Sequence, residues 1–510
     1  MKKRAFLKNA AILTATSLLL KTIGIFFRVY LSNKIGAEGM GLYQLIFSVY
    51  VLGSTFASSG IHTATTRLVT DELVCGTRKS VRQVLRRAIL LSLTVAAAST
   101  LLFYFGAPLV GTCWIQDLRA IPALKVLSLS FPFMGISNCI KGYFVARRRV
   151  GSSSRAQILE QLSRIAIILL LIDRFAAFGL TAACLAVMIG DTVSEAISCG
   201  YMVCSYYWDR RRVEVENTGT CVRSQGGVVR RLLSIAVPIT AGKYLNSGLR
   251  TIENVMVPNK LTVYTGARDI SLSQFGALKG MAMPLIFFPS SFLNAFSTLL
   301  VPEMSEARAL GQKRRVMRTV DHTLHITLLA SILVGGLFWL LADPLADLIY
   351  GSAEVAWYLK VLAPLVPVMY LESVVDGILR GLNQQISSLK YSVADSAIRI
   401  LLLFFLLPLW GMNGFLLIMV FSNLFTCGLN VRRLLKVSGT YLRWGKWIFR
   451  PVLAVAIGIA GCSLLGRIPA VAGLPDLLMI LLFGILTAGV YLLLLPLLGC
   501  ISRDDIRLRA

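Results

Sequence analysis

Two pairs of basic residues lie within apolar stretches of the chain, at a spacing that places each pair on one side of a helix. Lys21 and Arg28 are seven residues apart, and so are Lys243 and Arg250. Seven residues turn an α-helix through about 700°, so the members of a pair lie within ~20° of each other. Because a charge inside a membrane needs water, a partner or a ligand, we expect these cations to bind an anionic substrate group such as a diphosphate. The alternative for Arg28 and Arg250 is that their long side chains reach the membrane surface.

Two further charged pairs have the spacing of ion pairs on a helix. Glu160 and Arg164 are four residues apart, and Asp395 and Arg399 repeat this arrangement. Mutual neutralisation explains both pairs, and a role in a substrate cavity is the alternative.

Three other acidic residues also lie in apolar stretches. Asp191 and Glu195 have no basic neighbour close in the sequence, whereas Glu253 follows Arg250 by three residues, close enough to pair with it. Acidic residues in membrane helices are either structural groups or sites that relay protons or bind cations. We therefore keep a coupling role with H+ or Na+ as the alternative to a structural role for all three.

The motifs of nucleotide hydrolysis, acyl transfer and metal binding are absent from the sequence. It contains no G-x-x-x-x-G-K-[ST] phosphate loop, no G-x-S-x-G elbow and no C-x-x-C pair among its ten cysteines. His322 and His325 form a lone i,i+3 pair, which we interpret as a solvated helix end. We expect no cofactor, no metal and no enzymatic activity.

The composition is that of an integral membrane protein. Of 510 residues, 56% are hydrophobic and 15% are charged, whereas soluble domains carry about 25% charged residues. A net charge of +27 would suggest nucleic acid in a soluble protein, but here the basic residues stand in short loops between apolar segments. This placement indicates membrane topology and no nucleic-acid partner.

Fourteen apolar stretches are candidates for helices that cross a bilayer, each of which needs ~20 residues. With the N-terminus placed in the cytoplasm, the inside segments contain 36 Lys and Arg residues and the outside segments contain nine. This asymmetry follows the positive-inside rule and predicts that both termini are cytoplasmic. The expected spans are 6–31, 41–62, 88–110, 121–145, 156–172, 178–207, 232–257, 281–301, 322–342, 357–379, 391–409, 413–431, 449–466 and 477–499.

The two halves of the chain resemble each other. At an offset of 235 residues, Glu160 aligns with Asp395 and Arg164 with Arg399, without a gap from 131 to 170. A second match, at an offset of 222, aligns the two basic pairs on the first and seventh helices. An even number of spans separates the matched helices, so the repeat is parallel and places two six-helix lobes around a central cavity.

We therefore expect an all-α polytopic membrane protein with about 14 spans. Its predicted parts are an N-lobe of helices one to six, a basic cytoplasmic linker, a C-lobe of helices seven to twelve, two further helices and a cytoplasmic tail. In the same order, their boundaries are 1–208, 209–231, 232–431, 449–499 and 500–510.

Several segments resemble one family of membrane transporters. The stretches Phe6–Thr14 and Ile35–Leu45 are similar to the stage V sporulation protein B group, and further similarities are Ile158–Gln161 with Arg164, Met256–Asn259, Leu278–Pro284 and Phe287–Pro289. This group belongs to the polysaccharide exporters of the multidrug/oligosaccharidyl-lipid/polysaccharide (MOP) superfamily. The resemblance covers essentially the whole chain.

The resemblance implies a central cavity that opens alternately to each side of the membrane, and lipid-linked saccharides as substrates. The related lipid II flippases use cavity arginines on the first, second and eighth helices, with an acidic partner on the eighth. Lys21 and Arg28 correspond in kind to the pair on the first helix, with a spacing that differs by one residue. The second helix, around Gly53, has no arginine, and Pro284–Phe287 of the eighth has no acid.

We expect a monomeric transporter in the bacterial plasma membrane that flips an undecaprenyl-diphosphate-linked saccharide, such as a cell-wall precursor, to the outer leaflet. The first rival is an ion-coupled antiporter for cationic drugs, which four cavity cations would repel. A second rival, a membrane glycosyltransferase or polymerase, needs acidic catalytic residues over the membrane face, whereas the expected outer loops are short and poor in acids. A scaffold for cell-wall enzymes would not need charges inside its spans.

Single cysteines introduced into a cysteine-free variant should report this topology. We expect positions near 78, 148, 212, 314, 385 and 440 to resist an impermeant thiol reagent added outside intact cells, because their basic loops face the cytoplasm. Positions near 34 and 268, in predicted outer loops, are the labelled controls. Strong labelling near 212 or 314 would contradict the assignment.

Overall fold

The computed structural model describes residues 2–58, 60–212, 227–466 and 475–500. Within these ranges the chain forms helices and no strand, which confirms the predicted all-α class. It divides into two compact units, Met1–Asn259 and Lys260–Ala510. The lobe boundaries stay a prediction, and the linker at 213–226 and the tail at 501–510 lie outside the described residues.

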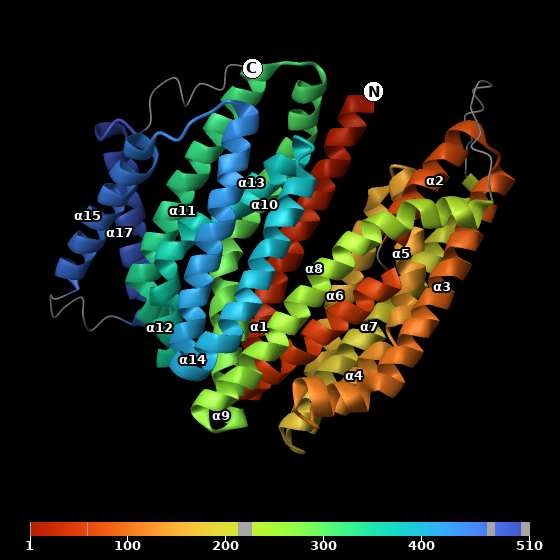
Figure 1. Cartoon of the computed structure of the whole chain (residues 1–510), viewed down its shortest axis with the longest axis horizontal. Coiled ribbons are helices and arrows are strands. Elements are labelled where there is room, and N and C mark those ends of the chain that lie inside the picture. Colours follow the sequence, from red (N-terminus) through yellow and green to blue (C-terminus); the bar gives the residue numbers. More distant parts are fainter. Residues whose placement is uncertain (1, 59, 213–226, 467–474, 501–510) are drawn as a thin grey trace. The chain divides into compact units, whose positions relative to one another are not determined.

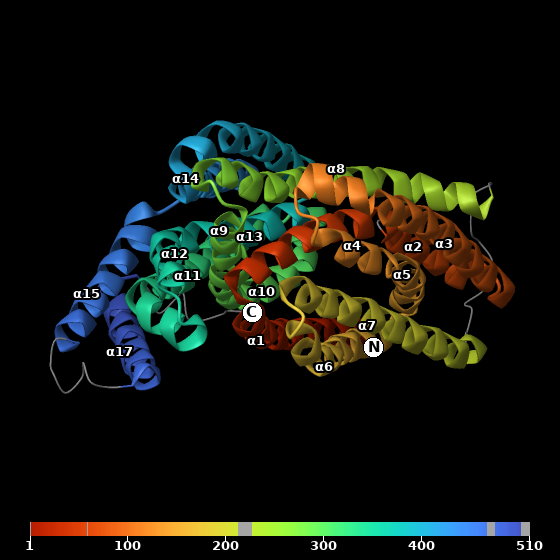
Figure 2. The same ribbon diagram turned by 90° about the horizontal axis from the view of Figure 1, so that it is seen from below.

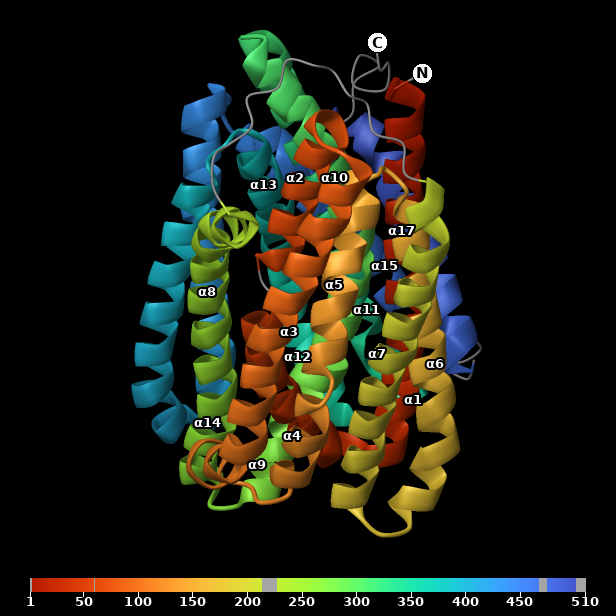
Figure 3. The same cartoon turned by 90° about the vertical axis from the view of Figure 1, so that its right-hand side faces the viewer.

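In the first unit, helices that follow one another along the chain pack pairwise. α6 and α7 lie side by side (Figure 3). α2, α3 and α5 enclose an apolar core in which Leu85, Tyr143 and Phe144 are each 1% exposed. The elements are α1 (Lys2–Ser58), α2 (Ile61–Cys75), α3 (Arg78–Leu109), η1 (Val110–Ile115), α4 (Ala120–Ser128), α5 (Phe131–Ala146), α6 (Val150–Ala176), α7 (Leu180–Asp209), η2 (Arg210–Arg212) and, up to Asn259, α8 (Val228–Thr265).

The second unit adds a C-terminal helix pair to its own core. α15 and α17 lie side by side (Figure 2) and pack against α11, where Trp447 and Tyr491 are buried. His325 of α11 is 5% exposed and stacks on Trp447, so the interpretation of His325 as part of a solvated helix end is wrong. The elements are α9 (Arg268–Gly276), η3 (Ala277–Ala282), α10 (Met283–Ala309), α11 (Lys313–Tyr350), α12 (Ala353–Leu362), η4 (Ala363–Leu365), α13 (Val366–Gly381), α14 (Gln385–Ser438), η5 (Gly445–Phe449), α15 (Arg450–Leu465) and α17 (Asp476–Leu497).

Left-handed glycines bend the longest helices. Gly36 has φ 69° inside α1, which Figure 1 shows in red, and Gly411 has φ 55° inside α14. Each of these helices therefore consists of two arms, and each bend falls between two predicted spans. Ten helical stretches among the described residues are long and apolar enough to cross a membrane, and the bends mean that one stretch can hold two spans. The total of fourteen spans stays a prediction.

The same backbone turn recurs in both units. Arg148, between α5 and α6, has φ 57°, and Asn383, between α13 and α14, has φ 58°. In both turns the amide of the next residue donates to the carbonyl five positions earlier, at 2.9 and 2.8 Å. The two turns are 235 residues apart, which is the offset of the predicted repeat.

In each unit a side-chain contact joins the turn to a later helical segment, but the two contacts differ in which partner is positively charged. In the first unit, Arg149 Nη1 lies 2.7 Å from Asp209 Oδ1, and Tyr143 donates to the same carboxylate at 2.9 Å. In the second unit, Arg433 Nη2 donates to Gln384 Oε1 at 2.6 Å. The arginine therefore stands on the turn in one unit and on the later helix in the other.

An ion cluster supports the bend of α1. Arg119 Nη1 lies 2.7 Å from Glu38 Oε1, two residues after Gly36, and Arg119 Nη2 lies 2.8 Å from Asp117 Oδ2. Hydrogen bonding to Asp117 raises the pKa of the Arg119 guanidinium, so the cation of this cluster persists at every physiological pH. The cluster joins the start of the second arm of α1 to the loop between η1 and α4.

Substituting alanine for Gly36 should destabilise the purified protein. No other side chain lies within 4 Å of the added Cβ, so the expected loss of about 1–3 kcal/mol comes from the positive-φ backbone alone. Gly24→Ala is the matched control, because Gly24 is helical, belongs to the same helix and also has open space around it. We expect that control to be neutral or stabilising by roughly 0.5 kcal/mol. Thermal unfolding in detergent measures the stability of both variants. An equal effect of the two substitutions would contradict backbone strain at position 36.

Candidate functional site

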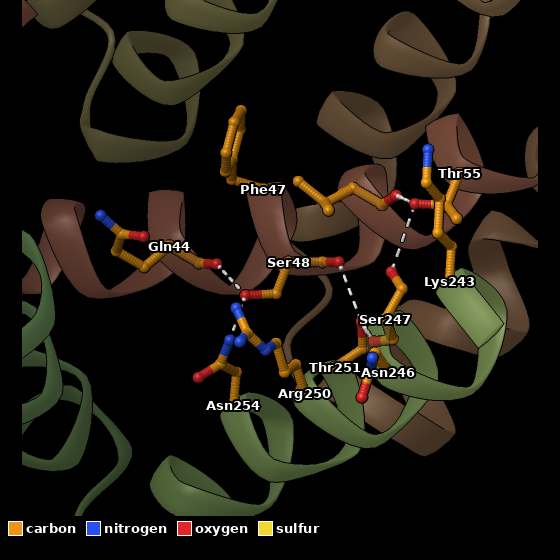
Figure 4. Close-up of a pocket in the computed structure, with 11 residues that line it drawn as sticks. Gln44, Phe47, Ser48, Thr55, Lys243, Asn246, Ser247, Arg250, Thr251 and Asn254 are labelled. Atoms are coloured by element: carbon orange, nitrogen blue, oxygen red, sulfur yellow. Dashed lines mark hydrogen bonds between the residues drawn. The ribbon is translucent and has the colours of Figure 1, made fainter. Parts of the chain in front are cut away.

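A polar pocket lies in the first unit between the second arm of α1 and α8 (Figure 4). It has a volume of about 440 Å³. Among the described residues no carboxylate lines it, and all of its lining side chains except Phe47 and Val51 are polar or basic. The lining consists of Gln44, Phe47, Ser48, Val51 and Thr55 from α1, and Lys243, Asn246, Ser247, Arg250, Thr251 and Asn254 from α8.

The helical period explains why these residues meet. Gln44, Ser48, Val51 and Thr55 follow one another by four, three and four positions, which puts them on one face of α1. The α8 residues repeat this spacing from Lys243 to Asn254. Each helix therefore presents a polar face to the other, although both sequences are apolar overall.

Short polar side chains hold the two helices together at the pocket. Asn254 Nδ2 donates to Ser48 Oγ at 3.0 Å, and Thr251 Oγ1 donates to the Ser48 carbonyl at 3.1 Å. Two turns away, Thr55 Oγ1 donates to Ser247 Oγ at 3.4 Å. These bonds use serine, threonine and asparagine, so the long cationic side chains of α8 are not needed to bind α1.

Lys243 and Arg250 give the pocket its positive charge. Both residues are exposed, and within the described part of the chain neither forms an ion pair. Figure 4 shows both side chains among the hydroxyl and amide groups of the lining. Two unneutralised cations with neighbouring hydrogen-bond donors can bind an anion, and arginine favours phosphate or carboxylate oxygens in a bidentate geometry.

The other predicted cations lie outside this pocket. Lys21 is exposed and Arg28 is half-buried, both on the first arm of α1, and neither belongs to the lining. Glu253 is 4% exposed on α8, and it also lies outside the lining. The structure therefore brings two of the four predicted substrate-binding cations into one pocket.

Gly36 and Gly266 serve as reference points for comparing the positions of the two basic pairs along their helices. Gly36 follows the first arm of α1, and Gly266, with φ 72°, follows α8. Aligning these glycines gives an offset of 230, in place of the 222 inferred from the charged residues. In this register Lys21 lies 15 residues before its glycine and Arg250 lies 16 residues before its own. These two cations therefore stand at nearly the same distance from a turn.

A second, partly buried charged cluster lies where α5, α6 and α7 meet, and Asp191 and Glu195 are its buried members. Arg164 Nη2 lies 3.1 Å from Glu160 Oε1, and Arg164 Nε lies 2.7 Å from Asp191 Oδ1. Lys141 Nζ approaches Glu160 Oε2 at 3.9 Å. Glu195, one helical turn after Asp191, is 8% exposed. The cluster thus unites four predicted residues of the first half with Lys141.

The second unit contains the other predicted pair. Arg399 forms an ion pair with Asp395 on α14, and Ser422 Oγ donates to Asp395 Oδ1 at 2.7 Å. Asp395 is 3% exposed, so its partners compensate a charge removed from water.

Sequence reasoning missed the neutral half of the pocket and one cation of the cluster. Gln44, Asn246 and Asn254 recur at helical spacing within apolar stretches, and this signal could have identified a polar face. Lys141 was counted within an apolar span and assigned no role. Its pairing with Glu160 depends on the packing of α5 against α6, which the linear sequence does not specify.

Comparison with known families places this architecture among membrane transporters. The family described as "Polysaccharide biosynthesis protein" matches residues 6–308, and the family described as "MatE" matches residues 262–405. Stage V sporulation protein B of Bacillus subtilis (strain 168) is 24% identical over 514 residues, covering 99% of this chain and 98% of that protein.

Two solved structures share the fold. The inward closed conformation of the lipid II flippase MurJ matches with a TM-score of 0.72 and 14% identity, covering 97% of this chain and 100% of that chain. An inward-facing multidrug resistance MATE family transporter of the MOP superfamily matches with a TM-score of 0.63 and 13% identity, covering 85% of this chain and 100% of that chain.

Replacing Arg164 by leucine should destabilise the fold strongly. The substitution leaves Asp191 and Glu160 with a buried charge and one partner fewer, for which we expect a loss of about 3–5 kcal/mol. Lys243→Ala, a cation without an ion pair in the described residues, should leave the unfolding temperature unchanged. Thermal unfolding in detergent compares the two variants, and a stable Arg164→Leu protein would show that the carboxylates do not depend on this arginine.

Proposed function

Because this chain belongs to the polysaccharide biosynthesis protein family of MOP-superfamily transporters, we propose that it flips an undecaprenyl-diphosphate-linked saccharide from the cytoplasmic to the outer leaflet. The proposed substrates are cell-wall precursors or similar polysaccharide building blocks. Transport proceeds by alternating access in a monomer with both termini in the cytoplasm, an orientation supported by the 36-to-9 split of basic residues.

The acid-free basic pocket is the observation that carries this proposal. A diphosphate is the fixed anionic part of every such lipid carrier, whatever sugar it bears. Lys243 and Arg250 can neutralise that charge in a site from which carboxylates are absent among the described lining residues. Lys21 and Arg28, on the first arm of α1, are proposed to bind the same diphosphate in one central cavity with Lys243 and Arg250, although they do not line this pocket.

The neutral side chains of the lining suit the sugar next to the diphosphate. Gln44, Asn246 and Asn254 carry amides that both donate and accept hydrogen bonds, as saccharide hydroxyls do. Such groups add affinity without binding as tightly as a buried ion pair. Moderate affinity is required, because a transporter must release its substrate in the second leaflet.

The principal rival is an ion-coupled antiporter for cationic drugs. The match of residues 262–405 to the MatE family is the observation that supports it. A cationic drug entering the pocket would meet Lys243 and Arg250 without a neighbouring lining carboxylate. Like charges in one small pocket repel and raise the free energy of the bound state. The pocket therefore favours the anionic substrate over the cationic one.

Transport by Arg250→Ala should fall at least about tenfold relative to the unchanged protein, because one charge-assisted hydrogen bond contributes about 1.5–3 kcal/mol. The assay reconstitutes full-length protein into vesicles with a panel of labelled lipid-linked saccharides and scores their exposure on the far leaflet. Arg230→Ala is the matched control, an exposed arginine of the same helix outside the pocket, and it should transport normally.

Two further outcomes decide between the candidates. One variant carries alanine at Lys21, Arg28, Lys243 and Arg250. If it flips the saccharide as well as the unchanged protein does, these residues are not the binding site. Export of a cationic dye, with no exposure of any lipid-linked saccharide, would support the antiporter instead.

A further inference from the structure

The buried cluster of the first unit contains one more acid than base. Its carboxylates are Glu160, Asp191 and Glu195, and its cations are Lys141 and Arg164. Glu160 contacts both cations and Asp191 contacts Arg164, so the available positive charge is already shared by two acids. The third acid, Glu195, makes the cluster negative whenever all three are ionised.

The surplus negative charge lies at carboxylate oxygens that lack hydrogen-bond partners. Glu195 is 8% exposed and has no hydrogen bond or ion pair within the described part of the chain. Oδ2 of Asp191, one helical turn away, is buried and also lacks a hydrogen-bond partner there. A buried carboxylate in this situation costs several kcal/mol unless it takes up a proton or binds a cation.

The charged and titratable groups around Glu195 come from several helices. Glu160 and Arg164 of α6 and Lys141 of α5 interact with it electrostatically, as does Asp191 of α7.

Three further titratable groups interact with the cluster. Tyr50 of α1 and Cys199 of α7 interact with Glu195. Tyr43 of α1 interacts with Asp191 and Arg28.

The corresponding site of the second half has no such surplus. At the repeat offset of 235, Asp191 and Glu195 correspond to the neutral residues Thr426 and Asn430. Lys141 corresponds to Asp376, whose charge is matched by an ion pair with Arg380. Asp395, the counterpart of Glu160, keeps its ion pair with Arg399. The additional carboxylates are therefore a property of the first half and are not required to pack this pair of helices.

From this arrangement we propose that Glu195 is the binding site of one exchangeable proton. Uptake of the proton neutralises Glu195 and leaves the two remaining acids matched by Lys141 and Arg164.

The proton site is electrostatically connected to the substrate pocket. Lys141 of the cluster and Lys243 of the pocket both act electrostatically on His62 of α2. The dependence of substrate flipping on an imposed pH gradient measures whether an anion at Lys243 and a proton at Glu195 affect each other's binding. Proton-driven transport rests on the proposed function, whereas proton binding at Glu195 does not.

Labelling with dicyclohexylcarbodiimide, which reacts with protonated carboxyl groups in apolar surroundings, tests the site in the unmodified full-length protein. We expect mass spectrometry to find Glu195 labelled at acidic pH, with a yield that falls about tenfold per pH unit above the midpoint. Glu160, which lies in the same cluster but is paired with two cations, is the internal control and should stay unlabelled. Label confined to Asp191 or Glu160, or no label on Glu195 at any pH, would overturn the proposal.

A parallel labelling series replaces choline with Na+ at constant pH. Equal labelling in both salts supports the proton site, whereas suppression by Na+ alone would overturn it in favour of a cation site.

Glu195→Gln, a neutral isostere, connects the site to transport. In vesicles, the variant should lose the dependence of flipping on an imposed pH gradient, while Asp173→Asn, an exposed carboxylate paired with Lys34, should keep it. An unchanged pH dependence in Glu195→Gln would overturn the coupling. If the unchanged protein flips no saccharide but Glu195 is labelled as expected, the proposed function fails and the proton site stands.

Discussion

A charge inside a membrane must be matched by an opposite charge, by water or by a ligand, and the first unit satisfies this constraint in two ways. At the α6–α7 cluster, Arg164 is shared by Glu160 and Asp191, so the burial of these two carboxylates, though not of Glu195, is compensated within the protein. At the pocket, Lys243 and Arg250 remain exposed and have no ion-pair partner among the described residues. The first solution stabilises the fold, and the second leaves charge available for a substrate.

The second arm of α1 links these two environments. Its face with Ser48 and Thr55 bonds to α8 at the pocket, while Tyr43 and Tyr50 interact with the acids of α7. A helix places such residues on different faces because successive positions are rotated by about 100°. A movement of this arm would therefore change the surroundings of the substrate site and of the buried acids together.

Contacts within one helix could be predicted from the sequence, but contacts between helices could not. The Glu160–Arg164 pair follows from its four-residue spacing, since the helical period brings the two side chains together. The contact of Arg164 with Asp191 depends on how α6 packs against α7, and neither residue signals the other in the sequence. The charged residues indicated an anion site, but the amides beside Lys243 were overlooked because apolar neighbours surround each of them. The bends at Gly36 and Gly411 need a positive φ, which a glycine permits but does not by itself predict.

The exchanged polarity of the contacts at the two repeated turns has a consequence for how the chain assembles. Arg149 meets an acid at Asp209, whereas Gln384 meets the guanidinium of Arg433. If the similar halves docked their helices crosswise during folding, Arg149 would face Arg433, and Asp209 would receive an uncharged amide. Asp209 would keep its contacts with Arg147 and Tyr143, but repulsion between Arg149 and Arg433 would disfavour that crossed arrangement. The reversed charge at one turn therefore favours the pairing of each half with its own helices over pairing with the helices of the other half.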